Sequence, residues 1–184
     1  FGITVWAAFG APRELELVIF DAHAPSRRLG EGTARTIAVL PNLHLLLVTA
    51  RPLEGEATFP SELTLGYDLY TSGASGAESI FGDDGERRRD LAYAPFEWPT
   101  VRLRAPGGSV SVLHGSCRKP HGRGKDAFNA LDLQLGQLIV AGEQPSNGAG
   151  LRPDGLFLTG DQIYADDVSP VFAALVSRLA ELLT

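Results

Sequence analysis

The sequence GLFLTGDQIYADD, which spans Gly155 to Asp167, joins an apolar run to a group of polar side chains. The run from Gly155 to Thr159 predicts a short strand that is buried on both faces of a sheet. The strand is expected to end at Gly160, and four side chains that can accept hydrogen bonds or bind metals follow it: Asp161, Tyr164, Asp166 and Asp167.

A helix is predicted directly after this stretch, with Ser169 as its N-cap and Pro170 at its first position. Because Ser169 already fills the capping position, Asp161 is not needed as a helix cap and becomes a candidate functional residue. The apolar residues of this last helix share one face: Phe172, Leu175, Val176, Leu179 and Leu183.

The composition is that of a globular protein of one ordinary domain or two small ones, with 184 residues, 44% hydrophobic and 21% charged. A net charge of -6 argues against nucleic acid as a partner, because phosphate backbones require a basic face. The longest apolar run, Leu43 to Ala50, predicts a strand and is too short to span a membrane. The single cysteine excludes an internal disulfide and leaves the compartment open.

The first part of the chain alternates short β-runs with turn-rich polar stretches. Ile3–Trp6 and Leu15–Phe20 are expected to pair across the turn at Gly10, Ala11 and Pro12, and residues 72–90 are expected to form an exposed loop. Four further β-runs show the same pattern: Thr36–Val39, Leu43–Thr49, Leu63–Leu69 and Thr100–Arg104. This pattern predicts an antiparallel β-sandwich of the immunoglobulin or fibronectin type over residues 1–107, with Leu63–Leu69 half-buried.

The pattern changes after Pro106–Gly108, where the domain boundary is expected. A strand is predicted from Ser109 to His114, and Asp126 is expected to cap a helix whose apolar residues are Phe128, Leu131, Leu135 and Leu138. With the strand at Gly155 and the last helix, residues 108–184 form a strand-helix-strand-helix unit. Such a unit implies two parallel strands joined by a right-handed crossover, and the whole chain is predicted to be α+β.

Residues that follow two parallel strands lie at one edge of the sheet, which places Cys117 and Asp161 together. A thiolate, a carboxylate and a phenolate are anionic ligands, so Cys117, Asp161 and Tyr164 together would suit ferric iron. The alternative is a buried inert cysteine, a turn aspartate and a packed tyrosine. Asp161, Asp166 and Asp167 are also oxygen donors for calcium, although they lack the spacing of a helix-loop-helix site.

Two further groups of residues lie next to Cys117. His114 and Ser116 have no orienting acid nearby and do not form a nucleophile motif, so His114 is expected to be a hydrogen-bonded core residue. The loop after Cys117 is cationic and suits a phosphate group, with Arg118, Lys119, His121, Arg123 and Lys125.

Taken together, residues 114–120 (HGSCRKP) and 152–167 (RPDGLFLTGDQIYADD) resemble the alkaline phosphatase D (PhoD-like) metallophosphatases. The resemblance implies that residues 108–184 are the first part of a metallophosphoesterase-type α/β sandwich. It implies a phosphomonoesterase or phosphodiesterase with a ferric ion and calcium. Cys117 and Tyr164 would bind iron, Asp161 would bridge iron and calcium, and Arg118 would help to hold the phosphate of the substrate.

The family draws further metal ligands from later strands, including an Asp-Asp-His-Glu-like motif, and this chain contains none of them. The sequence is therefore expected to be an excerpt of a longer enzyme, with weak or absent metal binding and doubtful activity by itself. Two alternatives stay open: an inactive truncated relative, and a non-catalytic binding module whose sandwich recognises a partner or a glycan.

Overall fold

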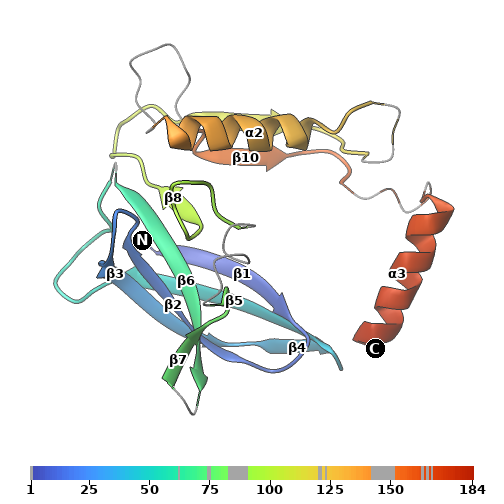
Figure 1. The fold of residues 1–184 in the computed structure, drawn as a ribbon, viewed down its shortest axis with the longest axis horizontal. Helices are drawn as coiled ribbons and strands as arrows, with labels where there is room; N and C mark the ends of the chain where they lie inside the picture. The colour runs from blue at the N-terminus through green and yellow to red at the C-terminus, as the bar shows by residue number, and fades with distance from the viewer. Residues whose placement is uncertain are drawn as a thin grey trace. The chain divides into compact units, whose positions relative to one another are not determined.

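The structure is a computed structural model, and it describes residues 2–61, 63–73, 76–82, 91–119, 122, 124–141, 152–162, 164, 166 and 168–184. The chain divides into two compact units, residues 1–105 with 180–184, and residues 106–179. Most of the regular structure is antiparallel sheet, and the described residues contain two helices. The prediction of an α+β chain with a β-rich first part is confirmed (Figure 1).

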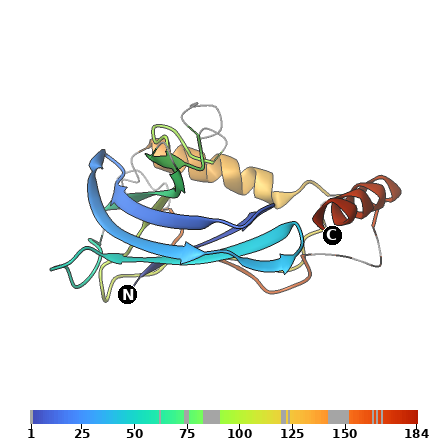
Figure 2. The same ribbon diagram turned by 90° about the horizontal axis from the view of Figure 1, so that it is seen from below.

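The first unit is built on one eight-stranded antiparallel sheet, ordered β1-β5-β3-β2-β6-β7, in which β4 also pairs with β5 and β8 with β6. Its strands are β1 (Ile3–Phe9), β2 (Glu14–Asp21), β3 (Ala24–Arg35), β4 (Ile37–Leu40), β5 (Leu43–Pro52), β6 (Thr64–Gly73), β7 (Gly76–Ser79) and β8 (Thr100–Arg102). Figure 2 shows how strongly the long blue and cyan strands bend.

The bend folds the sheet over its own hydrophobic core. Leu15 and Leu17 of β2 are completely buried against Leu46 and Val48 of β5, although these two strands are not paired. The two layers are joined through β3, which pairs with β2 along its length but pairs with β5 only at Gly30 and Glu31. The result resembles a sandwich made from one curled sheet.

The predicted pairing of the first two strands is wrong, because β1 pairs with β5 from Ile3↔Ala50 to Phe9↔His44. Both edges of β2 are already occupied by β3 and β6. Pairing with β5 also packs alternate β1 side chains against the core: Ile3, Val5, Ala7 and Phe9. The turn at Gly10–Pro12 therefore crosses between layers instead of closing a hairpin.

The polar strand β3 (Ala24–Arg35) lies where the sequence predicted no strand. Its residues have little β propensity, and its position follows from long-range pairing with β2.

Strand β6 is buried on both faces and not half-buried as predicted, since Leu65, Asp68 and Leu69 are all inaccessible to solvent. The Asp68 carboxylate accepts hydrogen bonds from the Leu69 backbone N–H (2.7 Å) and from the Ser79 hydroxyl (3.0 Å). Ser79 belongs to β7, so this buried carboxylate helps to attach β7 to β6. Part of the predicted loop 72–90 is therefore sheet, and residues 83–90 lie outside the described residues.

The second unit contains β9 (Val112–Gly115), α2 (Ala127–Val140), β10 (Gly155–Leu158) and the first ten residues of α3 (Pro170–Leu183). The predicted parallel pairing of the two strands is confirmed, and both predicted caps are present. The Asp126 side chain accepts a hydrogen bond from the Phe128 N–H at 3.1 Å, and the Ser169 hydroxyl accepts one from the Phe172 N–H at 3.3 Å.

The prediction that the second strand is buried on both faces is wrong. Leu156, Phe157 and Leu158 are 44%, 59% and 39% exposed. Within the described residues, β9 and β10 form a sheet of two strands, with α2 running along it (Figure 1), and so small a sheet cannot bury both of its faces. The apolar side chains of α3 are exposed as well.

The close approach of β3 to β5 predicts a strong effect of adding one methyl group at Gly32. A Cβ atom there would lie 2.1 Å from the carbonyl oxygen of Thr49, which is backbone and cannot rotate away. We expect Gly32→Ala to destabilise the first unit by about 2 kcal/mol or more, as overpacking does. Urea denaturation followed by far-UV circular dichroism measures the change.

The matched control is Gly10→Ala, because the nearest atom to a Cβ at Gly10 is the Asn42 carbonyl oxygen at 4.0 Å. We expect this variant to unfold within about 0.5 kcal/mol of the wild type. Equal stability of the two variants would contradict the tight β3–β5 crossing.

Candidate metal centre

The two loops that carry the predicted site residues begin where the parallel strands end. The ladder closes at Gly115↔Leu158, and the Thr159 N–H donates to the Gly115 carbonyl at 3.0 Å. Beyond it, the Arg118 N–H donates to the Asp161 carbonyl at 2.8 Å. These bonds place the loop after β9 beside the loop after β10, so Cys117 and Asp161 lie together.

Gly160 allows this close approach. A Cβ atom at this position would lie 2.6 Å from both the backbone nitrogen and the sulfur of Cys117, and 2.7 Å from the Ser116 hydroxyl oxygen. Any larger residue would therefore push the two loops apart. The sequence analysis treated Gly160 only as the end of a strand and missed this role.

The Cys117 sulfur accepts several hydrogen bonds. The Tyr164 hydroxyl, then the Ser116 hydroxyl at 3.7 Å, and then the Asp161 backbone N–H stabilise the thiolate and lower the pKa of Cys117. Burial and the Asp161 carboxylate oppose this shift. Cys117 is exposed, so it is a solvent-accessible thiol with increased thiolate character, as reactive and metal-binding cysteines are.

Tyr164 is the partner of this thiol. Donating its hydrogen bond to Cys117 raises the pKa of Tyr164 to about 12, with smaller contributions from burial and from the charges of Cys117, Asp161 and Asp166. The Lys119 ammonium lies 5.6 Å from the centre of the Tyr164 ring. In the metal-free protein, the phenol thus keeps its proton and shares it with the sulfur.

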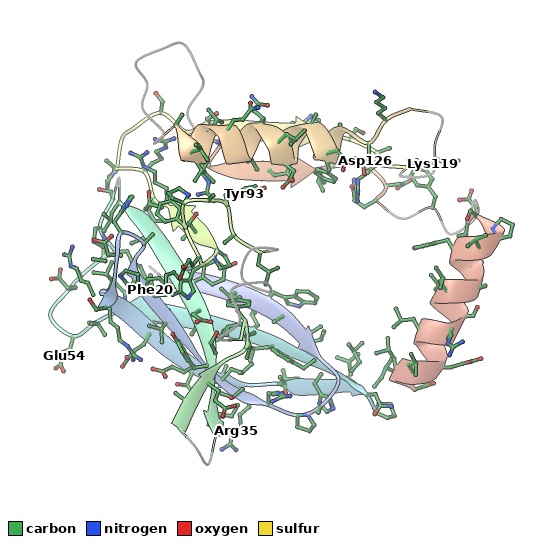
Figure 3. All side chains as sticks on the ribbon, in the orientation of Figure 1. Phe20, Arg35, Glu54, Tyr93, Lys119 and Asp126 are labelled. Carbon is green, nitrogen blue, oxygen red and sulfur yellow. The ribbon has the colours of Figure 1, made fainter. Side chains whose placement is uncertain are left out.

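Arg118 is held in place by Asp126, the residue that caps α2. Nε and Nη2 of Arg118 both bond to the Asp126 carboxylate, with Nε 3.1 Å from Oδ2, and the guanidinium lies 4.4 Å from the centre of the Phe128 ring. This pairing raises the pKa of Arg118 and lowers that of Asp126. Figure 3 labels Asp126 and Lys119 at this corner of the second unit. The sequence predicted the cap but not its pairing with Arg118.

A cavity of about 480 Å³ opens between α2 and the two strands. Its walls are apolar, with Leu113, Leu131, Leu156 and Leu158 among them. Cys117 and three cationic residues also line it: Arg118, Lys119 and Lys125. The cavity therefore combines apolar walls with the thiol and positive charge.

The other candidate residues have simpler surroundings. His114 is exposed and shares a hydrogen bond of 2.7 Å with the Thr159 hydroxyl, so the prediction of a core histidine is wrong although its hydrogen bond is present. The sheet of β9 and β10 has only two strands among the described residues, which is too narrow to bury the His114 side chain. Asp166 is exposed, and its charge acts on Tyr164. Three predicted residues lie outside the described part of the chain: His121, Arg123 and Asp167.

Cys117, Asp161 and Tyr164 are the three residues of the predicted metal site, and the structure brings them together. The Asp161 carboxylate is close enough to influence the charge states of both Cys117 and Tyr164. Among the described residues, no three His, Cys, Asp or Glu side chains gather as a metal-ion cluster. Tyr164 adds a phenolic oxygen to the predicted donors, which are sulfur and oxygen atoms that can all bind as anions.

No protein-family model, curated protein or solved structure matches this chain. In the described residues, no helix has the length and apolar character required to cross a membrane.

The Tyr164–Cys117 hydrogen bond predicts a change in thiol reactivity. Tyr164→Phe keeps the ring but removes the donor, so the pKa of Cys117 should rise towards that of an ordinary thiol. Only the thiolate is alkylated, and a higher pKa leaves less thiolate at pH 7.5. We therefore expect the rate of reaction with iodoacetamide to fall by roughly threefold or more. The rate measured from pH 6 to 10 gives the pKa in each protein.

The control is Tyr70→Phe in the first unit, which should leave the rate profile of Cys117 unchanged. If Tyr164→Phe also leaves the profile unchanged, the phenol does not bond to the thiol in solution.

Proposed function

We propose that this chain contributes to a metal-dependent phosphoric ester hydrolase of the PhoD-like kind. The observation that supports the proposal best is the meeting of Cys117, Asp161 and Tyr164 just beyond the ends of two parallel strands. On this proposal β9, α2, β10 and α3 are the first βαβα part of a metallophosphoesterase-type α/β sandwich. The substrate is a phosphomonoester or phosphodiester.

The donor set favours a ferric ion. An ion bound by Cys117 and Tyr164 must replace the proton that they share, and a phenol with a pKa of about 12 yields its proton only to a strong Lewis acid. The Asp161 carboxylate would also help to hold a second ion, and Asp166 would add an oxygen donor of the type calcium prefers. Bound ions would supply Lewis-acid polarisation of the phosphoryl group and neutralise its charge.

Arg118 is suited to contact the phosphate of the substrate. Asp126 occupies its Nε and Nη2 atoms, and Nη1 takes no part in that pair. The planar guanidinium is thereby oriented before a substrate arrives, which lowers the entropic cost of binding an anion. Lys119 and Lys125, which line the same cavity, add positive charge.

Ferric binding gives a direct test of the metal site. When Fe³⁺ is added as its nitrilotriacetate complex, we expect visible charge-transfer absorption from phenolate and thiolate ligands, with weak binding because the sequence supplies only part of the expected ligands. Tyr164→Phe should remove the phenolate contribution, and Cys117→Ser should replace a soft anionic ligand with a neutral hydroxyl. Because outer-shell partners alone contribute about 10- to 100-fold to affinity, loss of either ligand should weaken binding by about tenfold or more.

Tyr70→Phe serves again as the matched control and should give the spectrum of the wild type. Identical ferric spectra of the wild type and Tyr164→Phe would refute Tyr164 as a ligand, and with it the proposed metal centre.

A binding module is the second candidate, and the outer face of the first unit favours it. Trp6 and Leu47 are directly paired across β1 and β5, and both are more than 60% exposed. Ile37 pairs with Leu45 on the same face and is 73% exposed. An aromatic and aliphatic group of this kind is typical of contact surfaces.

Hydrolysis separates the two candidates. If the hydrolase proposal is right, the polypeptide supplied with Fe³⁺ and Ca²⁺ should release p-nitrophenol from bis(p-nitrophenyl) phosphate faster than the free ions do, but slowly, because the sequence supplies only part of the expected metal ligands. The release should stop on chelation and fall by about tenfold or more in Asp161→Asn. Trp6→Ser, on the outer face of the other unit, should leave the rate unchanged. No release above that of the free ions, or release that neither chelation nor Asp161→Asn reduces, would favour the binding module.

A further inference from the structure

Gln162 connects the two loops of the candidate metal centre. Its side-chain Nε2 donates to the carbonyl oxygen of Ser116 at 2.8 Å and to the carbonyl oxygen of Gly160 at 2.9 Å. Ser116 belongs to the loop that carries Cys117, and Gly160 begins the loop that carries Asp161 and Tyr164. A primary amide has two N–H donors, so both are used, one on each loop.

Regular pairing has already ended where Gln162 acts. The strand ladder stops at Gly115↔Leu158, and the Arg118 N–H···Asp161 carbonyl bond lies beyond it. The hydrogen bond from the Gln162 amide to the Ser116 carbonyl lies between the end of the ladder and the Arg118–Asp161 contact. Most residues of both loops are at least partly exposed, so the hydrogen bonds between the loops are important for holding them together.

The position of the Cys117 sulfur depends on this separation. At Gly160 the loops are so close that one added carbon would overlap the sulfur. The Tyr164 hydroxyl reaches the same sulfur from two residues beyond Gln162. A small movement of one loop would thus change the distance between the thiol and the phenol.

We propose that Gln162 is a positioning residue, whose amide ties the Cys117 loop to the Asp161–Tyr164 loop and so sets the geometry of the three metal donors. Gln162 is not one of the proposed metal donors, and it acts through the carbonyl groups of Ser116 and Gly160. Its importance for metal binding rests on the proposed function, whereas its effect on the loops does not.

The test compares three variants. Gln162→Met keeps the length of the side chain but removes both donors. Gln162→Lys returns N–H donors on a flexible chain. Gln137→Met is the control: it is the same substitution on α2, at a residue whose side chain is exposed and lies outside the site.

The first readout is hydrogen exchange of the Arg118 backbone amide in the metal-free protein, followed by NMR. We expect Gln162→Met to speed this exchange by about tenfold, because losing two hydrogen bonds promotes local opening. Gln162→Lys should recover most of the protection, and Gln137→Met should match the wild type. Unchanged exchange in Gln162→Met, or a global loss of protection equal to that of Arg118, would overturn the positioning role.

The second readout is the ferric charge-transfer spectrum. Gln162→Met should weaken ferric binding and shift the absorption band, whereas a residue that only adds stability would leave the band in place. Faster exchange with an unshifted band would contradict control of the donor geometry. Faster exchange in a protein that never develops a ferric band, the wild type included, would uphold the connection between the loops and refute the proposed metal function.

Discussion

The parallel pairing of β9 with β10 is the constraint on which the candidate site depends. Its register sets Gly115 opposite Leu158, so the chain leaves both strands at the same edge of the sheet. Residues 44 positions apart, Cys117 and Asp161, are then joined through the Arg118 N–H and the Asp161 carbonyl. A shift of one residue would turn alternate side chains to the other face and separate the donors.

The chemistry of the site follows from one shared proton. Tyr164 donates to Cys117, and this bond makes the thiol more acidic and the phenol less acidic. On the proposed function, a highly charged cation held by Cys117 and Tyr164 would take the place of this proton. The same preorganisation appears at Arg118, where Asp126 both caps α2 and orients the guanidinium.

Local sequence signals predicted the elements that depend on local physics. The helix caps at Asp126 and Ser169 are hydrogen bonds between near neighbours, and both are present. The run from Leu43 to Ala50 is mostly apolar, and it forms most of β5. The partner of β1 and the polar strand β3 could not be predicted in this way, because pairing between distant strands decided both. The strand Leu63–Leu69 was predicted to be half-buried, yet the curl of the sheet also buries Asp68 on its second face.

By itself, the sequence determined the candidate donors, since Cys117, Asp161 and Tyr164 are recognisable by residue type and by their place after two predicted strands. It also determined the parallel order of those strands, because a helix must cross between them. Only the tertiary structure decided which atoms meet: the phenol with the sulfur, Arg118 with Asp126, and the Gln162 amide with two carbonyl groups. Such contacts depend on the spacing of loops from distant parts of the chain, and that spacing is fixed only when the strands pair.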